Sequence, residues 1–169
     1  YGFRRVGSTP VFAETNGTDN KYLYAVYAIC EGEIAGINRI KIDDNEIYPK
    51  IGANEVYTAG TIYTTSAGTY SGRLKFQLFY GTEAQTQSEL MNETPNWRTK
   101  SRTLPGVVYA AMRFEWKVST QAEQESNPYG GGLPNVTFDV FGKKVYDVTT
   151  HTGGANVPDV YDNLTKVWS

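Results

Sequence analysis

One run of alternating residues, at positions 107–118, constrains the fold of this chain more than any other stretch. Its apolar side chains recur at every second position: Val108, Ala110, Met112, Phe114, Trp116 and Val118. Because successive side chains of a β-strand point to opposite faces, this spacing predicts a strand with one continuous apolar face. The other face begins apolar at Val107 and ends charged at Lys117, which predicts that one end is more buried than the other.

Other runs repeat this theme. Residues 21–29 are apolar on both faces, which predicts a central strand covered on both sides. Residues 73–80 alternate, with Phe79 as an exception on the polar face, and residues 37–42 and 135–141 alternate as well. Shorter strands are expected at 3–6, 10–13, 46–48, 61–65 and 145–148. A turn at 7–9 is expected to join the first two, and Pro10 is expected to confine its strand to a start or an edge.

The segments between these strands carry weaker signals. Thr82 and Gln85 have the spacing of a capping box, so one short helix is expected around 83–92, centred on 88–92. Trp97 is expected to fill the gap between that helix and a sheet. Residues 48–72 form a weakly specified excursion, the stretch expected to be most mobile. The remaining connections are expected to be a loop at 121–134 and a turn at 142–144. An apolar patch at 157–164 is compatible with a short helix.

Composition supports one β-rich domain. The chain has 169 residues, and its 13 Tyr, 7 Phe and 3 Trp exceed what a core alone requires. Tyr and the other aromatics favour strands, and Tyr is also enriched at interfaces. The predicted fold is mainly β, an antiparallel barrel or sandwich over residues 1–169, with one short helix and long loops.

Several function classes find no support in the sequence. The net charge of −2 and the absence of a basic run argue against nucleic-acid binding. Cys30 lies in an apolar run, which favours a buried thiol, and with His151 as the one histidine no Cys/His zinc cluster is expected. No run reaches the length of a membrane span, and no leader precedes the first strand. The abrupt ends at Tyr1 and Ser169 suggest a piece of a longer polypeptide.

Candidate chemical sites are few. The acidic stretch of Asp43, Asp44 and Glu46 is compatible with a calcium site, but it lacks EF-hand spacing and a solvated hairpin turn is favoured. The triplet Gly130–Gly132 is compatible with a phosphate cradle, but no P-loop Lys-Ser/Thr follows it and a flexible loop is favoured. His151 has no nucleophile elbow to act with.

No catalytic, cofactor-binding or metal residue is therefore predicted, and the chain is not expected to be an enzyme. A glycosidase would need two carboxylates about 5–10 Å apart, and no pair stands out. Four glycosylation sequons are ascribed to chance: Asn16, Asn92, Asn135 and Asn163. A carbohydrate-binding module is the alternative, because aromatic-rich sandwiches stack sugars on exposed rings, here those of Trp97, Trp116 or Trp168.

Residues 133–147 contain an expected strand followed by Gly-Lys-x-Val-Tyr-Asp. Other blocks occur along nearly the whole chain: Tyr-Gly-x-x-Arg-Val-Gly at 1–7, a Gly-Glu-Ile strand pair at 21–44, a Gly-x-x-x-Gln, Trp and Gly-x-x-Tyr series at 81–109, and Trp-Ser at 168–169. These blocks resemble, in the same order, those of the tail-tip (host-specificity, J-like) proteins of siphophages and prophages, in which the series at 81–109 ends in Gly-x-Ala-Tyr. Departures occur at Val108 and at 148–149, and the excursion at 48–72 matches no family motif.

This resemblance implies a structural role without catalysis. Such proteins form a homotrimeric baseplate hub that closes the tail tube, contacts other tail-tip proteins and connects to receptor-binding parts. It implies a domain of a virion protein that is made in the bacterial cytoplasm and assembled into the phage tail. It implies host-surface contact through the full-length protein, and neither nucleic-acid binding nor a membrane span.

Overall fold

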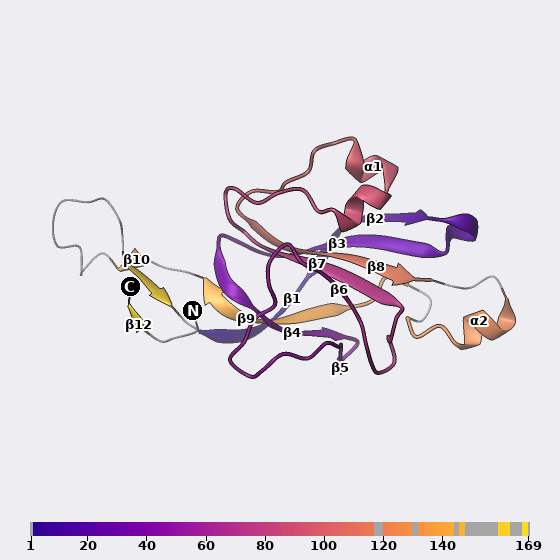
Figure 1. The fold of residues 1–169 in the computed structure, drawn as a ribbon, viewed down its shortest axis with the longest axis horizontal. Coiled ribbons are helices and arrows are strands. Elements are labelled where there is room, and N and C mark those ends of the chain that lie inside the picture. The colour runs from indigo at the N-terminus through magenta and orange to yellow at the C-terminus, as the bar shows by residue number, and fades with distance from the viewer. Residues whose placement is uncertain are drawn as a thin grey trace.

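Two antiparallel sheets packed face to face form the body of the molecule (Figure 1). The structure is a computed structural model that describes residues 2–116, 120–129 and 132–143, together with the backbone of three further short strands. The five-stranded sheet has the order β2-β3-β8-β7-β6, and the four-stranded sheet has the order β1-β9-β4-β5. The expected mainly β, antiparallel architecture is confirmed as a sandwich, and the sheets do not close into a barrel.

The strand bounds follow in chain order. They are β1 Phe3–Gly7, β2 Thr9–Asn16, β3 Tyr22–Glu31, β4 Ile34–Ile42, β5 Asn45–Glu46, β6 Ile62–Thr64, β7 Leu74–Tyr80, β8 Val107–Glu115 and β9 Val136–Lys143. A small third sheet contains β10 Tyr146–Asp147, β11 Asp159–Asp162 and β12 Val167–Trp168. Among the described residues the helices are two α-helices, α1 Pro95–Arg98 and α2 Gln121–Glu125, and two 3₁₀ turns, η1 Thr18–Asn20 and η2 Leu90–Glu93. None of the described helices is both long and apolar enough to cross a bilayer.

Strand β8 occupies the centre of the five-stranded sheet, as the alternating run predicts. Its apolar face from Val108 to Phe114 is fully buried against the second sheet. The opposite face is buried too, because Tyr109 and Ala111 belong to a second, smaller core. The five-stranded sheet is therefore covered on both sides, and both faces of β3 are buried for the same reason.

The second core explains the position of Phe79. Its ring stacks on that of Tyr109 with a centroid separation of 4.4 Å, on the face away from the four-stranded sheet. Residues 81–106 cover this face, and they contribute Met91 and the fully buried Trp97. Trp97 thus fills the gap between a helical segment and a sheet, as the sequence predicts.

The two N-terminal strands do not form the expected hairpin. Strand β1 pairs with β9 in one sheet, and β2 pairs with β3 in the other. The chain crosses between the sheets at Ser8, whose Oγ donates to the carbonyl of Val136 at 2.7 Å. The edge position predicted from Pro10 is confirmed, because β2 is the last strand of its sheet and carries a bulge between Pro10 and Phe12.

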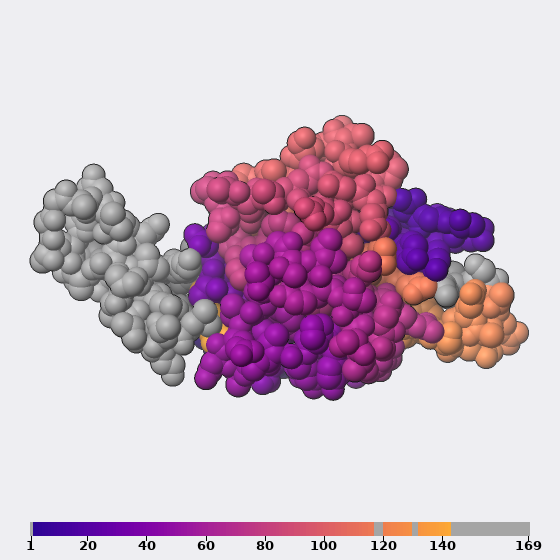
Figure 2. Space-filling model, in the orientation of Figure 1, coloured from indigo at the N-terminus to yellow at the C-terminus, as the bar shows by residue number. Residues whose placement is uncertain are grey.

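The excursion at 48–72 packs against both sheets of the sandwich. Tyr57 is buried there, and its backbone N–H donates to Ile37 of β4 at 2.9 Å. Its carbonyl accepts from the hydroxyl of Tyr80 on β7, and Gly60 N–H donates to Leu78 of β7 at 2.8 Å. The excursion therefore bridges both sheets, and in Figure 2 it covers much of the face turned to the viewer.

The helices differ from the expectation in position and number. The 3₁₀ turn η2 overlaps the expected position at 88–92, but the chain from 83 to 89 is non-helical and α1 follows at 95–98. Helix α2 lies in the expected loop at 121–134 and has a capping box formed by Thr120 and Glu123. Strand β11 replaces the helix expected at 157–164, and β10 pairs with β11 instead of β9, which runs on through most of the expected turn at 142–144.

Candidate functional site

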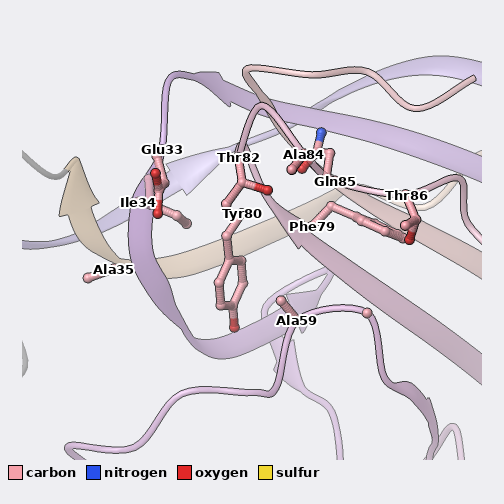
Figure 3. Close-up of a pocket in the computed structure, with 11 residues that line it drawn as sticks. Glu33, Ile34, Ala35, Ala59, Phe79, Tyr80, Thr82, Ala84, Gln85 and Thr86 are labelled. Atoms are coloured by element: carbon pink, nitrogen blue, oxygen red, sulfur yellow. The ribbon is translucent and has the colours of Figure 1, made fainter.

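A pocket of about 310 Å³ lies at one end of the sandwich (Figure 3). Four segments meet there: the start of β4, the excursion, the end of β7 and the loop that follows β7. The lining residues are Glu33, Ile34, Ala35, Ala59, Gly60, Phe79, Tyr80, Thr82, Ala84, Gln85 and Thr86. Figure 3 shows the Tyr80 ring between Ile34 and Ala59, so much of the lining is apolar.

The polar groups of this pocket serve the fold. The hydroxyl of Tyr80 donates to the carbonyl of Tyr57, and burial raises the pKa of Tyr80 well above its ordinary value. The Gln85 amide is bonded to backbone groups on both sides. Among the described lining residues Glu33 is the one carboxylate, so the pocket does not bring together the acid–base pair that glycoside hydrolysis uses.

The acidic stretch at 43–46 forms a hairpin turn, as the sequence analysis favoured. Asp43 and Asp44 have φ values of 46° and 68°, the left-handed conformation that Asp tolerates in two-residue turns. Asp43 Oδ1 accepts the backbone N–H of Asn135 at 3.3 Å, which ties the turn to the start of β9. Glu46 lies 3.5 Å from Lys50 Nζ. The described residues contain no group of three or more metal-ligating side chains.

The other candidate residues from the sequence are either outside the described residues or have covered rings. Gly130, Gly131 and His151 lie outside the described residues. Trp97 is 1% exposed, so its ring has no face on which a sugar could stack. The Trp116 ring stacks on Tyr129 at 5.8 Å, which occupies one of its faces, and the side chain of Trp168 lies outside the described residues.

A polar cluster that the sequence did not indicate lies where η2 meets the five-stranded sheet. Glu93 accepts hydrogen bonds from the hydroxyl of Tyr24 and, at 3.0 Å, from Arg113 Nη1. Burial would raise the pKa of Glu93, but these two hydrogen bonds outweigh it and hold that pKa below its ordinary value. The pKa of Tyr24 is raised, first by burial and then by the bond to the carboxylate. The cluster fastens the helical segment to β3 and β8.

Gln85 is the second residue whose role the sequence did not reveal. Its side chain does not cap a helix but accepts the Gly81 N–H at 3.1 Å and donates to the carbonyls of Leu104 and, at 3.0 Å, Val107. It therefore joins the two ends of the segment that covers the second core.

Three glycines of the family-like blocks meet beside Gln85. The Gly32 N–H donates to the Gly106 carbonyl at 2.7 Å. Gly81 has φ +79°, and a Cβ built on it would lie 2.9 Å from the Gly32 carbonyl oxygen. Only glycine fits such a conformation at such a separation. Backbone packing thus fixes these positions.

No protein-family model and no curated protein matches the chain. Among solved structures the chain is similar to a chain in a structure described as the virion of a native gene transfer agent (GTA) particle. The alignment covers 90% of this chain and 29% of that chain, with 15% sequence identity and a TM-score of 0.49. This chain therefore spans less than a third of that neighbour, and a likeness at this level carries no inference about role.

Proposed function

We propose that this chain is a structural domain of the tail-tip hub of a bacteriophage or prophage, and that it acts by assembly and not by catalysis. The support is the set of sequence blocks that resemble the tail-tip family and follow one another in family order. In the complete protein, the domain would contact its own copies in a homotrimer and neighbouring tail-tip proteins. Host-surface contact would occur through the full-length protein.

The observation that carries the proposal is that residues from separate blocks contact one another. Arg5 of the first block forms a two-pronged bond with Asp139 of the last, with Nε–Oδ1 at 2.7 Å and Nη2–Oδ2 at 3.0 Å. Gly32 of the second block donates to Gly106 of the third. A chance scatter of similar residues has no reason to produce such contacts, whereas a shared scaffold does. The blocks therefore support a common hub-type fold.

Immunogold electron microscopy tests the proposal. Particles are purified from the strain that carries the gene and labelled with antibodies raised against the 169-residue chain. Gold at the distal end of the tail is the expected result, and antibodies pre-absorbed with the purified chain are the control. Labelling confined to capsids, or absence of the protein from dissociated particles, would contradict the proposal. The mass of the full-length protein in solution separately tests the expected trimer.

A further inference from the structure

We propose that the free edge of β2, together with a basic strip beside it, binds an extended acidic segment of a partner polypeptide. The basic strip consists of Arg98, the last residue of α1, and of Lys100 and Arg102 in the loop that follows it, at alternate positions of the chain. This inference does not depend on the hub function, because it rests on the edge strand and on the charges next to it.

Strand β2 offers an unpaired edge of eight residues. It is the terminal strand of its sheet and pairs with β3 alone. Its side chains from Thr9 to Val11 are exposed, and Val11 is 56% exposed, one of four large apolar side chains on the surface of the described chain. The outward N–H and C=O groups of such an edge form a template on which a second polypeptide can add a strand.

Arg102 is a cation that packs between two aromatic rings and forms no ion pair with a described residue. Its guanidinium carbon lies 5.6 Å from the centre of the Phe12 ring on β2 and 5.5 Å from that of Trp97. Its Nε is buried and has no hydrogen-bond partner among the described residues, and the same is true of Trp97 Nε1. A buried donor without an acceptor costs free energy, so two of them in one cluster point to acceptors that a partner supplies.

The charges of the neighbourhood specify the chemistry of the partner. Arg98 and Lys100 are exposed, and no acidic residue occurs from 94 to 114. No ion pair forms between the basic strip and any described residue. Glu14, the acid of β2, accepts from Asn96 of α1 at 2.8 Å through Oε1, which holds the helix beside the edge strand (Figure 1), while its Oε2 is buried without a partner among the described residues. The three cations of the strip outnumber this one carboxylate. The complement of this surface is therefore negatively charged.

A polypeptide fits this surface better than a nucleic acid does. Only a polypeptide completes the backbone ladder of β2, and its alternate side chains would emerge on the face that Phe12 and Glu14 share, toward Arg102. Three cations on a chain of net charge −2 would attract the phosphate backbone of a nucleic acid only weakly. An added strand with Asp or Glu at alternate positions would pair its backbone with the free edge of β2 and its carboxylates with the basic strip.

Selection from a library of random linear peptides, long enough to pair along all of β2, tests the proposal with the whole chain as bait. We expect the selected peptides to carry acidic residues at alternate positions and to bind more weakly as salt rises. Arg102→Gln is expected to weaken their binding about tenfold. The matched control is Arg4→Gln, which removes an exposed charge from β1 in the other sheet. A proline in the middle of each peptide is expected to abolish binding, because it interrupts the ladder.

Thermal melting of each variant verifies that it is folded, and Lys100→Gln provides a second, fully exposed test of the strip. Failure to enrich any peptide would overturn the proposal, as would peptides whose binding is indifferent to both Arg102→Gln and Lys100→Gln. Single-stranded DNA and anionic lipid vesicles are assayed in parallel. If either one bound more tightly than the selected peptides, and did so in a way that depends on Arg102, the partner would belong to that class and the polypeptide proposal would be wrong.

Discussion

At the scale of single residues, Glu93 connects more of the molecule than its position in a short 3₁₀ turn suggests. Its carboxylate accepts from Tyr24 of β3 and Arg113 of β8, and its carbonyl accepts from Asn16 at the end of β2. Arg113 also lies 4.5 Å from the centre of the Tyr22 ring. One residue thus links three adjacent strands to the segment that covers them, β3 and β8 through its side chain and β2 through its carbonyl.

Replacing Glu93 with Gln is therefore expected to destabilise the chain at pH 7 by about 1 kcal/mol, a modest value because 45% of the side chain is exposed and solvent screens the pair. The pKa of Glu93 in the folded state lies below its ordinary value of 4.5. Its contribution is therefore fully present above pH 4.5 and is lost as the pH falls through the folded-state pKa. Urea denaturation at several pH values should show the gap between the two proteins closing in acid.

Glu89→Gln is the matched control, because Glu89 is exposed and precedes the same turn. It should leave the free energy of unfolding within about 0.5 kcal/mol of the parent protein. A gap for Glu93→Gln that persists unchanged as the pH falls far below 4.5, through the whole range in which carboxylates become protonated, would show that the carboxylate charge is not what stabilises the cluster.

Residue roles were predictable where periodicity governs them and unpredictable where a polar group finds a distant partner. The exceptional Phe79 and the isolated Trp97 were recognisable because apolar side chains out of phase with a strand imply a second apolar layer. Glu93 and Arg113 lie 20 positions apart, and the basic strip is spread over alternate residues. Neither contains a local pattern that distinguishes it from ordinary surface charge.

At the scale of elements, the excursion at 48–72 depends on close contact with β4. A Cβ built on Gly36 would lie 2.5 Å from Cγ1 of Val56, so the two segments touch without room for a methyl group. Gly36→Ala should therefore destabilise the chain by about 1–3 kcal/mol, the usual cost of overpacking. Chemical denaturation measures this loss, and limited proteolysis within 48–72 should accelerate.

A double mutant separates this steric effect from any other. Val56→Gly removes all three atoms that the new Cβ would meet, at 2.5, 2.6 and 2.9 Å, so the double mutant should recover part of the stability that Gly36→Ala loses. Gly7→Ala serves as the control, because a Cβ at Gly7 has no neighbour within 4 Å. An additive loss in the double mutant would mean that Val56 is not the obstacle.

The loop after β7 shows how a correct residue can suggest the wrong element. Thr82 and Gln85 have capping-box spacing, but the Gln85 amide is engaged with the carbonyls of Leu104 and Val107. A long-range bond of this kind competes with a local cap and cannot be distinguished from it by spacing. The actual capping box, at Thr120 and Glu123, has the same spacing in a stretch without apolar periodicity.

Gln85→Ala should cost about 2 kcal/mol, because it leaves partly buried backbone groups at both ends of the covering segment without partners. Hydrogen exchange should quicken at the Gly81 amide, which Gln85 Oε1 accepts in the parent protein. Gln87→Ala is the control, since Gln87 bonds only to the exposed Asn92 side chain. Unchanged protection of Gly81 in Gln85→Ala would contradict the assigned role.

At the scale of the whole molecule, the strands were predictable but their partners were not. Alternation fixes which residues face a core, and nearly every expected strand of the two main sheets is present. Alternation does not say that β1 pairs with β9 and β2 with β3, since Phe3 and Phe141 meet across most of the chain length. The expected hairpin between the first strands was wrong because a short turn at Ser8 also suits a crossing between two sheets.

This topology makes β9 decisive for folding. It lies between β1 and β4, so the four-stranded sheet has no continuous pairing without it. A chain that ends at residue 143 keeps both sheets and should unfold in one cooperative urea transition, as we expect of the full chain. A chain that ends at residue 134 lacks β9, leaves the Ile40 and Ile42 face of β4 without its neighbour, and should show no such transition. Tryptophan fluorescence and the dispersion of amide NMR signals measure both, and the shared Trp97 and Trp116 make the two chains comparable. Cooperative unfolding of the shorter chain would show that the five-stranded sheet and its covering segment form an independent folding unit.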